Sequence, residues 1–252
     1  MRLLRRHLLG LAFAAGFAVS LAPAADAATV TAAVAANFTK VATDLAAKFK
    51  AKTGDDVVLS FGATGALYTQ ITQAAPFDVF LSADDKRTKT AINDGFGVDG
   101  TDFTYAVGKV VLYSPTIDVT DGAAVLKANA FQYIAIADPK AAPYGAAGMA
   151  VLDKLGLAAE LTPKIVTGEN ITQTQQFVDS GSAELGFVAL SQVIGKPATQ
   201  IWLAPPEDYP AIKQNAVLLK SGAANDAAKA FLDFLKSDEA IAVIKAAGYG
   251  LE

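Results

Sequence analysis

The sequence predicts an α/β protein whose strands form two mainly parallel sheets, each flanked by helices. Strand-like segments alternate with helix-like segments from residue 29 to the end of the chain. The 252 residues suffice for two ordinary domains, each with its own core. A long β-rich run at 104–114 and an apolar run at 216–219 are interpreted as paired crossings between the domains. A single doubly wound domain is the alternative.

Period-two alternation, or a short apolar run between turn residues, indicates the strands. We expect them at 29–35, 56–61, 79–82, 104–114, 133–137, 185–190 and 216–219. Apolar residues three and four apart indicate the helices, as in Phe38, Val41, Leu45 and Phe49 ahead of Thr53-Gly54. We expect helices at 38–53, around Leu67 and Ile71, and at 86–93, 144–155, 171–180, 225–236 and 238–247, with Gly248 as the last stop signal.

The two crossings set the bounds of the two predicted domains. The first domain is predicted at 28–106 plus 216–252, because the last two helices return to it, and the second at 107–215.

Residues 1–27 have the pattern of a cleaved signal peptide. Arg2, Arg5 and Arg6 form a basic start, an apolar run covers 8–22, and Ala25-Asp26-Ala27 supplies small residues for cleavage after Ala27. The run is shorter than the roughly 20 residues that span a membrane, so we expect no membrane insertion. The adjacent arginines are compatible with either general or twin-arginine export.

Removing the leader defines which chemistry the mature chain can perform. It takes away the only His and three of four Arg, leaving 18 basic and 24 acidic residues, a net charge near −6. A chain without His or Cys and with only Arg87 excludes thiol nucleophiles, most His-assisted hydrolases and most zinc enzymes. Its acidity also disfavours nucleic acid and anionic membrane as partners.

Two further features of the sequence could suggest an enzyme. The sequence 95–100 matches the dinucleotide pattern G-x-G-x-x-G, but a helix precedes it and a strand follows, so we interpret it as a loop. The abundant carboxylates leave a two-carboxylate glycosidase open as an alternative, although no pair stands out.

Four strand-to-helix turns combine small residues with a short polar side chain. They cover 35–39, 61–65, 142–146 and 169–172. Each turn places free main-chain N–H groups at the positive end of a helix, and ligands of parallel sheets bind beyond these strand ends. Together they predict a cleft that binds a small oxyanion through neutral donors. Taken singly, Asn37, Thr64 and Asn170 are explained equally well as N-caps.

Several segments, in this order along the chain, resemble the molybdate-binding proteins of bacterial ABC importers. They are V-A-A-N-F at 34–38, S-F-G-A-T-G at 60–65, P-F-D-V-F-L-S-A-D at 76–84, A-D-P-K-A-A-P-Y-G at 137–145, E-L-G-F-V-A-L-S at 184–191 and I-K-A-A-G-Y at 244–249. The resemblance covers essentially the whole mature chain.

The resemblance implies a type II periplasmic binding protein with two lobes and two hinge strands. Such a protein is not an enzyme and has no cofactor. It closes on molybdate or tungstate as a monomer in the periplasm and presents the anion to a membrane permease. An oxyanion such as sulfate or phosphate is the alternative ligand. A receptor for organic carboxylates would need an Arg at a turn, and Arg87 is not at one.

The resemblance also implies the binding residues. Asn37 and Thr64 stand at the side-chain positions of the first two turns, and Tyr144 and Ile171 at the main-chain positions of the second lobe. Their neighbours, expected as further main-chain donors, are Ala36, Ala63 and Asn170.

One position departs from the pattern of some members, which have a Tyr where this chain has Ala189. We hypothesise that the Tyr144 hydroxyl replaces it, so that Tyr144→Phe weakens oxyanion binding. Asp84 is expected to cap the next helix, Arg87 to lie on the surface and Trp202 to be a packing residue.

Overall fold

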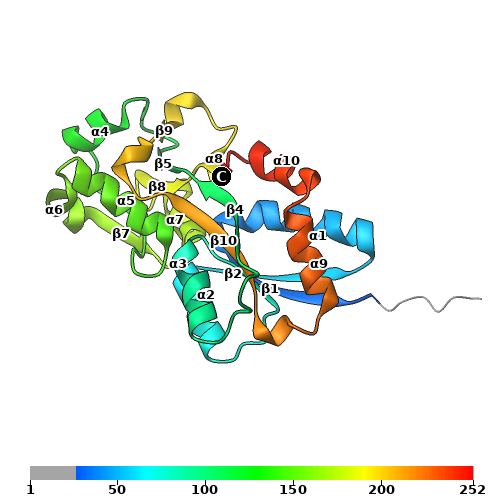
Figure 1. Ribbon diagram of the computed structural model, residues 1–252. Coiled ribbons are helices and arrows are strands. Elements are labelled where there is room, and N and C mark those ends of the chain that lie inside the picture. Colours follow the sequence, from blue (N-terminus) through cyan, green and yellow to red (C-terminus); the bar gives the residue numbers. More distant parts are fainter. Residues whose placement is uncertain (1–26, 252) are drawn as a thin grey trace, which may run out of the picture.

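The computed structural model describes residues 27–251, which form two α/β lobes side by side (Figure 1). All of the predicted signal peptide except Ala27, including Arg2, Arg5, Arg6 and His7, lies outside the described residues.

The first lobe is built on a five-stranded sheet in the order β2-β1-β3-β10-β4. Its strands are β1 (Thr29–Ala35), β2 (Asp56–Gly62), β3 (Val79–Leu81), β4 (Phe103–Gly108) and β10 (Ile212–Leu218). β10 alone runs antiparallel to its neighbours in this sheet. Its helices are α1 (Thr39–Thr53), α2 (Thr64–Thr72), α3 (Asp85–Asn93), α9 (Asp226–Leu235) and α10 (Asp238–Ala246), with the 3-10 turn η1 (Ala36–Phe38) ahead of α1.

The second lobe repeats this plan in the order β7-β6-β8-β5-β9. Its strands are β5 (Val110–Tyr113), β6 (Ile134–Ala137), β7 (Ile165–Gly168), β8 (Leu185–Ala189) and β9 (Ile201–Leu203). Here β5 is the antiparallel strand, paired with both β8 and β9. Its helices are α4 (Gly122–Ala128), α5 (Pro143–Lys154), α6 (Ala158–Leu161), α7 (Ile171–Asp179) and α8 (Leu190–Val193). Two mainly parallel sheets flanked by helices confirm the predicted fold class.

The chain passes between the sheets next to Lys109. The sequence predicts one continuous strand at 104–114, and this is wrong in detail, because β4 ends at Gly108 in the first sheet and β5 begins at Val110 in the second. The return strand begins at Ile212 rather than residue 216. The short strands β7 and β9 and the helix α4 were not predicted. The lobe boundaries 106/107 and 215/216 stay predictions.

Each lobe has its own apolar core, and the cores meet at the cleft. In the first lobe, α9 and α10 pack on β1 and α1 through residues such as Phe231 and Ile244. The core of the second lobe reaches across to four small residues of the first, Ala35, Ala36, Ala63 and Ala83. Small side chains at these strand ends let the two backbones approach each other closely.

Local signals explain the helix ends. Gly54 ends α1 and Gly248 follows α10, both in the left-handed conformation, with φ of 86° and 87°. Residues 95–100 lie between α3 and β4, which confirms that the G-x-G-x-x-G match is a loop.

We predict that Gly145 is the glycine on which the start of α5 depends. A Cβ there would lie 2.0 Å from the Ala137 carbonyl oxygen at the end of β6. Overpacking of this kind costs about 2 kcal/mol, so Gly145→Ala should lower the melting temperature by roughly 4–8 °C. Gly250→Ala is the matched control, since its Cβ would meet nothing nearer than 3.5 Å. Equal melting temperatures for the two variants would contradict this.

Candidate functional site

Four helix starts meet at the carboxyl ends of parallel strands. In the first sheet, Ala35 at the end of β1 is in register with Gly62 at the end of β2, so η1 and α2 begin next to each other. In the second sheet, Ala137 of β6 is in register with Gly168 of β7, and α5 and α7 follow. The two lobes therefore present equivalent edges to each other across the cleft.

A small cavity of about 10 Å³, room for about one water molecule, lies between these edges. The structure brings together six of the seven predicted residues around it: Ala36, Asn37, Ala63, Thr64, Tyr144 and Ile171. The seventh, Asn170, lies in the adjoining hollow with Thr172 and Gln173. No charged side chain of the described residues lines the cavity.

The polar groups at the cavity are mostly hydrogen-bond donors. Thr64, Tyr144 and Ile171 lie in the first turns of α2, α5 and α7, where a main-chain N–H has no acceptor within the helix. The Thr64 hydroxyl accepts a hydrogen bond from the Ala83 N–H (3.0 Å), which leaves its own hydrogen free to donate. Such a set suits an anion held without a cation.

Of Asn37, Thr64 and Asn170, which the sequence allowed as helix N-caps, only Asn170 is one in the structure. The Asn37 and Thr64 side chains cap no helix, because Phe38 and Ala63 occupy those N-cap positions. Asn37 and Thr64 are instead buried at the cavity, with 5% and 1% of their surface exposed. Asn170 does cap α7, accepting hydrogen bonds from the N–H groups of Thr172 and Gln173. Asp84 caps α3, as predicted.

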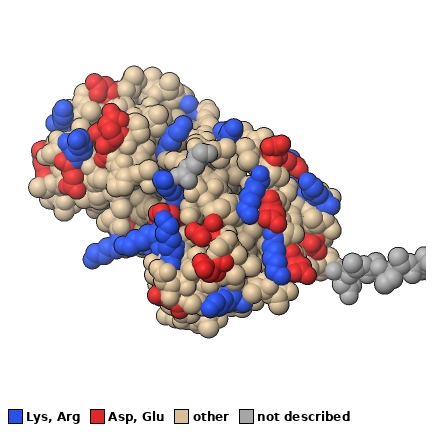
Figure 2. Space-filling model, in the orientation of Figure 1, with Lys and Arg blue, Asp and Glu red and all other residues tan. Residues whose placement is uncertain are grey.

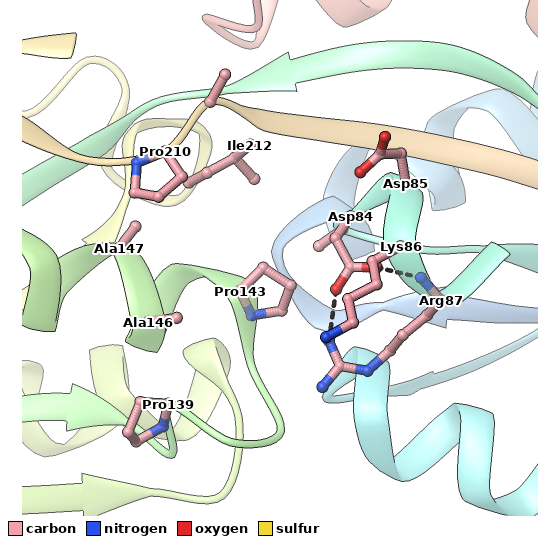
Figure 3. Close-up of a pocket in the computed structure, with 12 residues that line it drawn as sticks. Asp84, Asp85, Lys86, Arg87, Pro139, Pro143, Ala146, Ala147, Pro210 and Ile212 are labelled. Atoms are coloured by element: carbon pink, nitrogen blue, oxygen red, sulfur yellow. Dashed lines mark hydrogen bonds and ion pairs between the residues drawn. The ribbon is translucent and has the colours of Figure 1, made fainter. Parts of the chain in front are cut away.

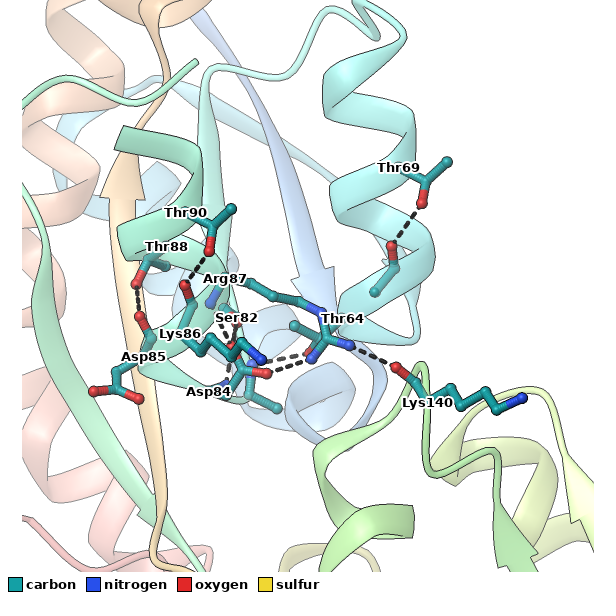
Figure 4. Close-up of polar contacts among 12 residues, drawn as sticks. Thr64, Thr69, Ser82, Asp84, Asp85, Lys86, Arg87, Thr88, Thr90 and Lys140 are labelled. Carbon is teal, nitrogen blue, oxygen red and sulfur yellow. Dashed lines mark hydrogen bonds and ion pairs between the residues drawn. The ribbon is translucent and has the colours of Figure 1, made fainter. Parts of the chain in front are cut away.

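Arg87 is partly exposed, with 22% of its side-chain surface accessible, and it also makes a contact between the lobes that the sequence did not indicate. Its guanidinium pairs with Asp84 within the first lobe and donates to the Lys140 carbonyl oxygen of the second lobe at 2.7 Å (Figure 4). Neither contact was predicted, and nothing in the sequence indicates the second, which spans 53 residues. Trp202 packs against the core of the second lobe, as predicted.

Further hydrogen bonds join the lobes around the cavity. The Gly65 N–H donates to the Ala141 carbonyl oxygen at 2.8 Å, beside Arg87. On the other side, the hydroxyls of Thr172 and Ser191 donate to the main-chain oxygens of Ala36 and Asn37. The structure therefore shows the lobes closed on each other.

A larger groove of about 250 Å³ lies next to Arg87 at the lobe interface (Figure 3). One wall carries Asp84 and Arg87, and the other carries Pro139, Pro143 and Pro210. The groove therefore differs from the smaller cavity in being lined by charged side chains, which include Asp85 and Lys86, and in lacking the converging helix starts.

A buried polar cluster behind the cavity was missed by the sequence analysis. The fully buried Gln214 of β10 accepts hydrogen bonds from Asn37 Nδ2 (2.8 Å) and the Tyr105 hydroxyl (3.1 Å), and donates to the Tyr144 hydroxyl (3.2 Å). The Tyr249 hydroxyl accepts from Asn37 Nδ2 at 2.9 Å. The available signal was a run of three polar residues, Lys213, Gln214 and Asn215, directly ahead of the apolar end of the strand.

Burial governs the acidity of the tyrosines in this cluster. Loss of hydration raises the pKa of Tyr105 and Tyr144 well above the usual value near 10, and raises that of Tyr249 to about 12. All three hydroxyls therefore remain neutral donors and acceptors at physiological pH.

The charge pattern and composition add two facts. Acidic and basic side chains are interspersed over the face shown in Figure 2, without a field of one sign. Between residues 27 and 251 no helix combines the length and apolarity needed to cross a membrane, and no cluster of three or more His, Cys, Asp or Glu side chains could hold a metal ion.

Comparison with known proteins identifies close relatives. The model of the bacterial extracellular solute-binding protein family matches residues 30–250. The molybdate-binding protein ModA of Rhodobacter capsulatus is 53% identical over 242 residues, 96% of both chains. ModA of Azotobacter vinelandii is 52% identical, covering 92% of this chain and 94% of the relative.

A solved structure agrees in fold. The periplasmic molybdate-binding protein of Azotobacter vinelandii superposes with a TM-score of 0.85 at 42% identity, covering 88% of this chain and 99% of that one.

We predict that the buried tyrosines make the protein unstable in alkali. An unfolded tyrosine loses its proton near pH 10, whereas the folded groups keep theirs to higher pH, so the unfolded state binds fewer protons in this range. The free energy of unfolding should therefore be unaffected by these groups below about pH 10 and then fall by up to about 1.4 kcal/mol per pH unit for each tyrosine.

Urea unfolding at pH 9, 10 and 11 measures this slope, and Tyr249→Phe should make it shallower. A slope that is the same in the variant would show that Tyr249 does not contribute.

Proposed function

The chain belongs to the molybdate-binding proteins of the bacterial extracellular solute-binding family, and we propose that it captures molybdate in the cavity between its lobes for delivery to an ABC importer. The main support for this proposal is the cavity, where four helix starts and neutral hydrogen-bond donors converge. The similarity of the chain to molybdate-binding relatives supports it further. We extend the proposal to tungstate, a tetrahedral dianion of nearly equal size.

The proposed contacts come from both lobes. The first lobe contributes the side chains of Asn37 and Thr64, and the second the main-chain N–H groups of Tyr144 and Ile171. Neighbouring main-chain donors complete the set: Ala36, Ala63 and Asn170. Their position at the cavity or beside it supports this set. Each hydrogen bond to a charged group contributes about 1.5–3 kcal/mol, so a few suffice for tight binding.

The absence of a carboxylate from the lining favours a fully ionised ligand. A protonated oxyanion such as monohydrogen phosphate would need an acceptor for its hydrogen, which an Asp or Glu would supply. Sulfate, the alternative ligand, carries no such hydrogen and differs from molybdate in size. The relatives named above favour molybdate over sulfate.

The family consists of solute-binding proteins rather than enzymes, and we propose that this chain has no catalytic activity and needs no cofactor. We further propose that it is exported, loses residues 1–27 by cleavage after Ala27, and works as a monomer in the periplasm. Its partner is a permease in the inner membrane.

We propose that binding closes the predicted lobes, 28–106 plus 216–252 and 107–215, about the strand change near Lys109 and the start of β10. The Arg87 contact with Lys140 and the Gly65 contact with Ala141 form only when the lobes are close together, which supports this motion.

Thermal unfolding of the mature protein with each oxyanion tests the ligand. A ligand present at a thousandfold excess over its dissociation constant adds about 4 kcal/mol of stability. We expect large increases in melting temperature with millimolar molybdate and tungstate, and little or no increase with sulfate or phosphate. A melting temperature that does not change with molybdate would refute the proposed function.

Removal of a single main-chain donor tests how the anion is held. Ile171→Pro deletes the N–H at the first position of α7, where proline is well tolerated, and Asn170 ahead of it already has an extended conformation, with φ −151° and ψ 173°. Losing one charge-assisted hydrogen bond should weaken molybdate binding roughly tenfold to a hundredfold.

Ile171→Val is the matched control, because it keeps the N–H and a side chain close in size to proline. Titration calorimetry on both variants gives the comparison. Equal affinities would exclude the Ile171 N–H as a ligand.

A further inference from the structure

The cluster behind the cavity leaves one oxygen of Asn37 without a partner. Both hydrogens of Asn37 Nδ2 are used, by Gln214 and by Tyr249. No hydrogen bond to Asn37 Oδ1 forms among the described residues. Every fully buried side-chain nitrogen or oxygen of these residues does have a hydrogen-bond partner, so Asn37 Oδ1 is not fully buried. The Oδ1 atom therefore borders open space, and the space that Asn37 lines is the cavity.

This orientation of the amide is unsuited to an anion. A carbonyl oxygen facing a dianion repels it, whereas the amide NH₂ would attract it. At the same time the Tyr144 hydroxyl accepts from Gln214 Nε2, and its own hydrogen is directed to the neighbouring Tyr249 hydroxyl. The cluster as it stands therefore turns an acceptor, Asn37 Oδ1, toward the binding site.

The opposite orientation also keeps the cluster hydrogen-bonded. It requires the Tyr249 hydroxyl to donate to Asn37 Oδ1 rather than to the Asn37 main-chain oxygen, which keeps its hydrogen bond from the Ser191 hydroxyl. When both amides turn over, Gln214 Nε2 donates to Asn37 Oδ1 and to the Tyr105 hydroxyl, and Gln214 Oε1 accepts from the Tyr144 hydroxyl. Tyr105 can then donate to the Ser82 carbonyl oxygen, 3.1 Å away. The two ends of an amide have nearly the same shape, so the change needs little movement. Asn37 Nδ2 then faces the cavity.

We propose that Gln214 is the positioning residue that turns the Asn37 amide toward the bound oxyanion, using the Tyr144 hydroxyl as the donor that holds its own amide in place. The proposal rests on the proposed function, since it needs an anion in the cavity. Gln214 does not contact the anion itself. The Tyr144 hydroxyl thereby acts through Gln214, which differs from the direct contact that the sequence analysis hypothesises.

The backbone supports a special role for this position. The pairing of β10 with β4 shifts register between Gln214 and Asn215, and the residue without a partner in the register is Tyr105 of β4, whose hydroxyl contacts Gln214. Gln214 thereby links Asn37 and Tyr105 of the first lobe to Tyr144 of the second.

Gln214→Glu provides the sharpest test, because the ionised carboxylate has the same shape but only accepts hydrogen bonds. It would hold Asn37 Nδ2 and the Tyr144 hydrogen toward itself and keep Asn37 Oδ1 facing the anion. Protonated Glu regains one donor and one acceptor. Burial favours that protonated form as the pH falls, and the facing hydroxyls of Tyr105, Tyr144 and Tyr249 stay neutral below pH 10.

Molybdate affinity is therefore measured by calorimetry between pH 6 and 8.5 for the wild type and for Gln214→Glu, and expressed as their ratio. We expect the variant to bind roughly a hundredfold more weakly at pH 8.5 and to recover at least tenfold of this loss at pH 6. A ratio that does not change with pH would overturn the proposal.

Gln214→Met is the matched control, with a side chain of similar length that can neither orient Asn37 nor titrate. It should bind roughly tenfold more weakly than the wild type at every pH. Wild-type affinity in this variant would also overturn the proposal. Failure of the wild type to bind molybdate would instead refute the proposed function, so the two failures are distinguishable.

A double-mutant cycle separates the two roles of Tyr144 without requiring Gln214→Glu to fold. If the hydroxyl acts through Gln214, Tyr144→Phe weakens binding in the wild type but has little further effect in Gln214→Met. Additive losses would show a direct contact with the anion and exclude the role of Gln214.

Discussion

The convergence of four helix starts on one point is the constraint on which the rest of this structure depends. A dianion bound without a cation needs several N–H groups within hydrogen-bonding distance at once. Their positions are set by the strands, because Ala35 and Gly62 end in register in one sheet and Ala137 and Gly168 in the other. Close approach of these ends also requires small residues, which explains why alanine and glycine dominate the turns.

The repeated strand order follows from the same constraint. Each sheet places two parallel strands next to each other so that the helices after them begin side by side, and each adds one antiparallel strand. In the first sheet that strand is β10, which carries the chain back from the second lobe. The return strand therefore passes directly behind the cavity, and Gln214 lies within reach of side chains from both lobes.

The sequence predicted what depends on neighbouring residues and missed what depends on distant ones. The bounds of β1 and the end of α1 follow from local periodicity and a glycine. The break at Lys109 was missed because apolar residues continue on both sides of it. Asn37 was open to a capping role, since caps and anion ligands are the same residue types. In the structure Phe38 takes the N-cap position, and the Asn37 amide contacts Gln214, 177 residues away. The Arg87 contact with Lys140 is equally non-local.

The use of neutral donors also fits a protein that must release its ligand. Two unit charges 4 Å apart attract each other by about 4 kcal/mol even at an effective dielectric constant of 20, and a dianion doubles this. An arginine in the cavity would add that attraction to every release step. The one arginine among residues 27–251, Arg87, instead pairs with Asp84 and donates to the Lys140 carbonyl oxygen. It therefore joins the two lobes outside the cavity, whose lining carries no charged side chain.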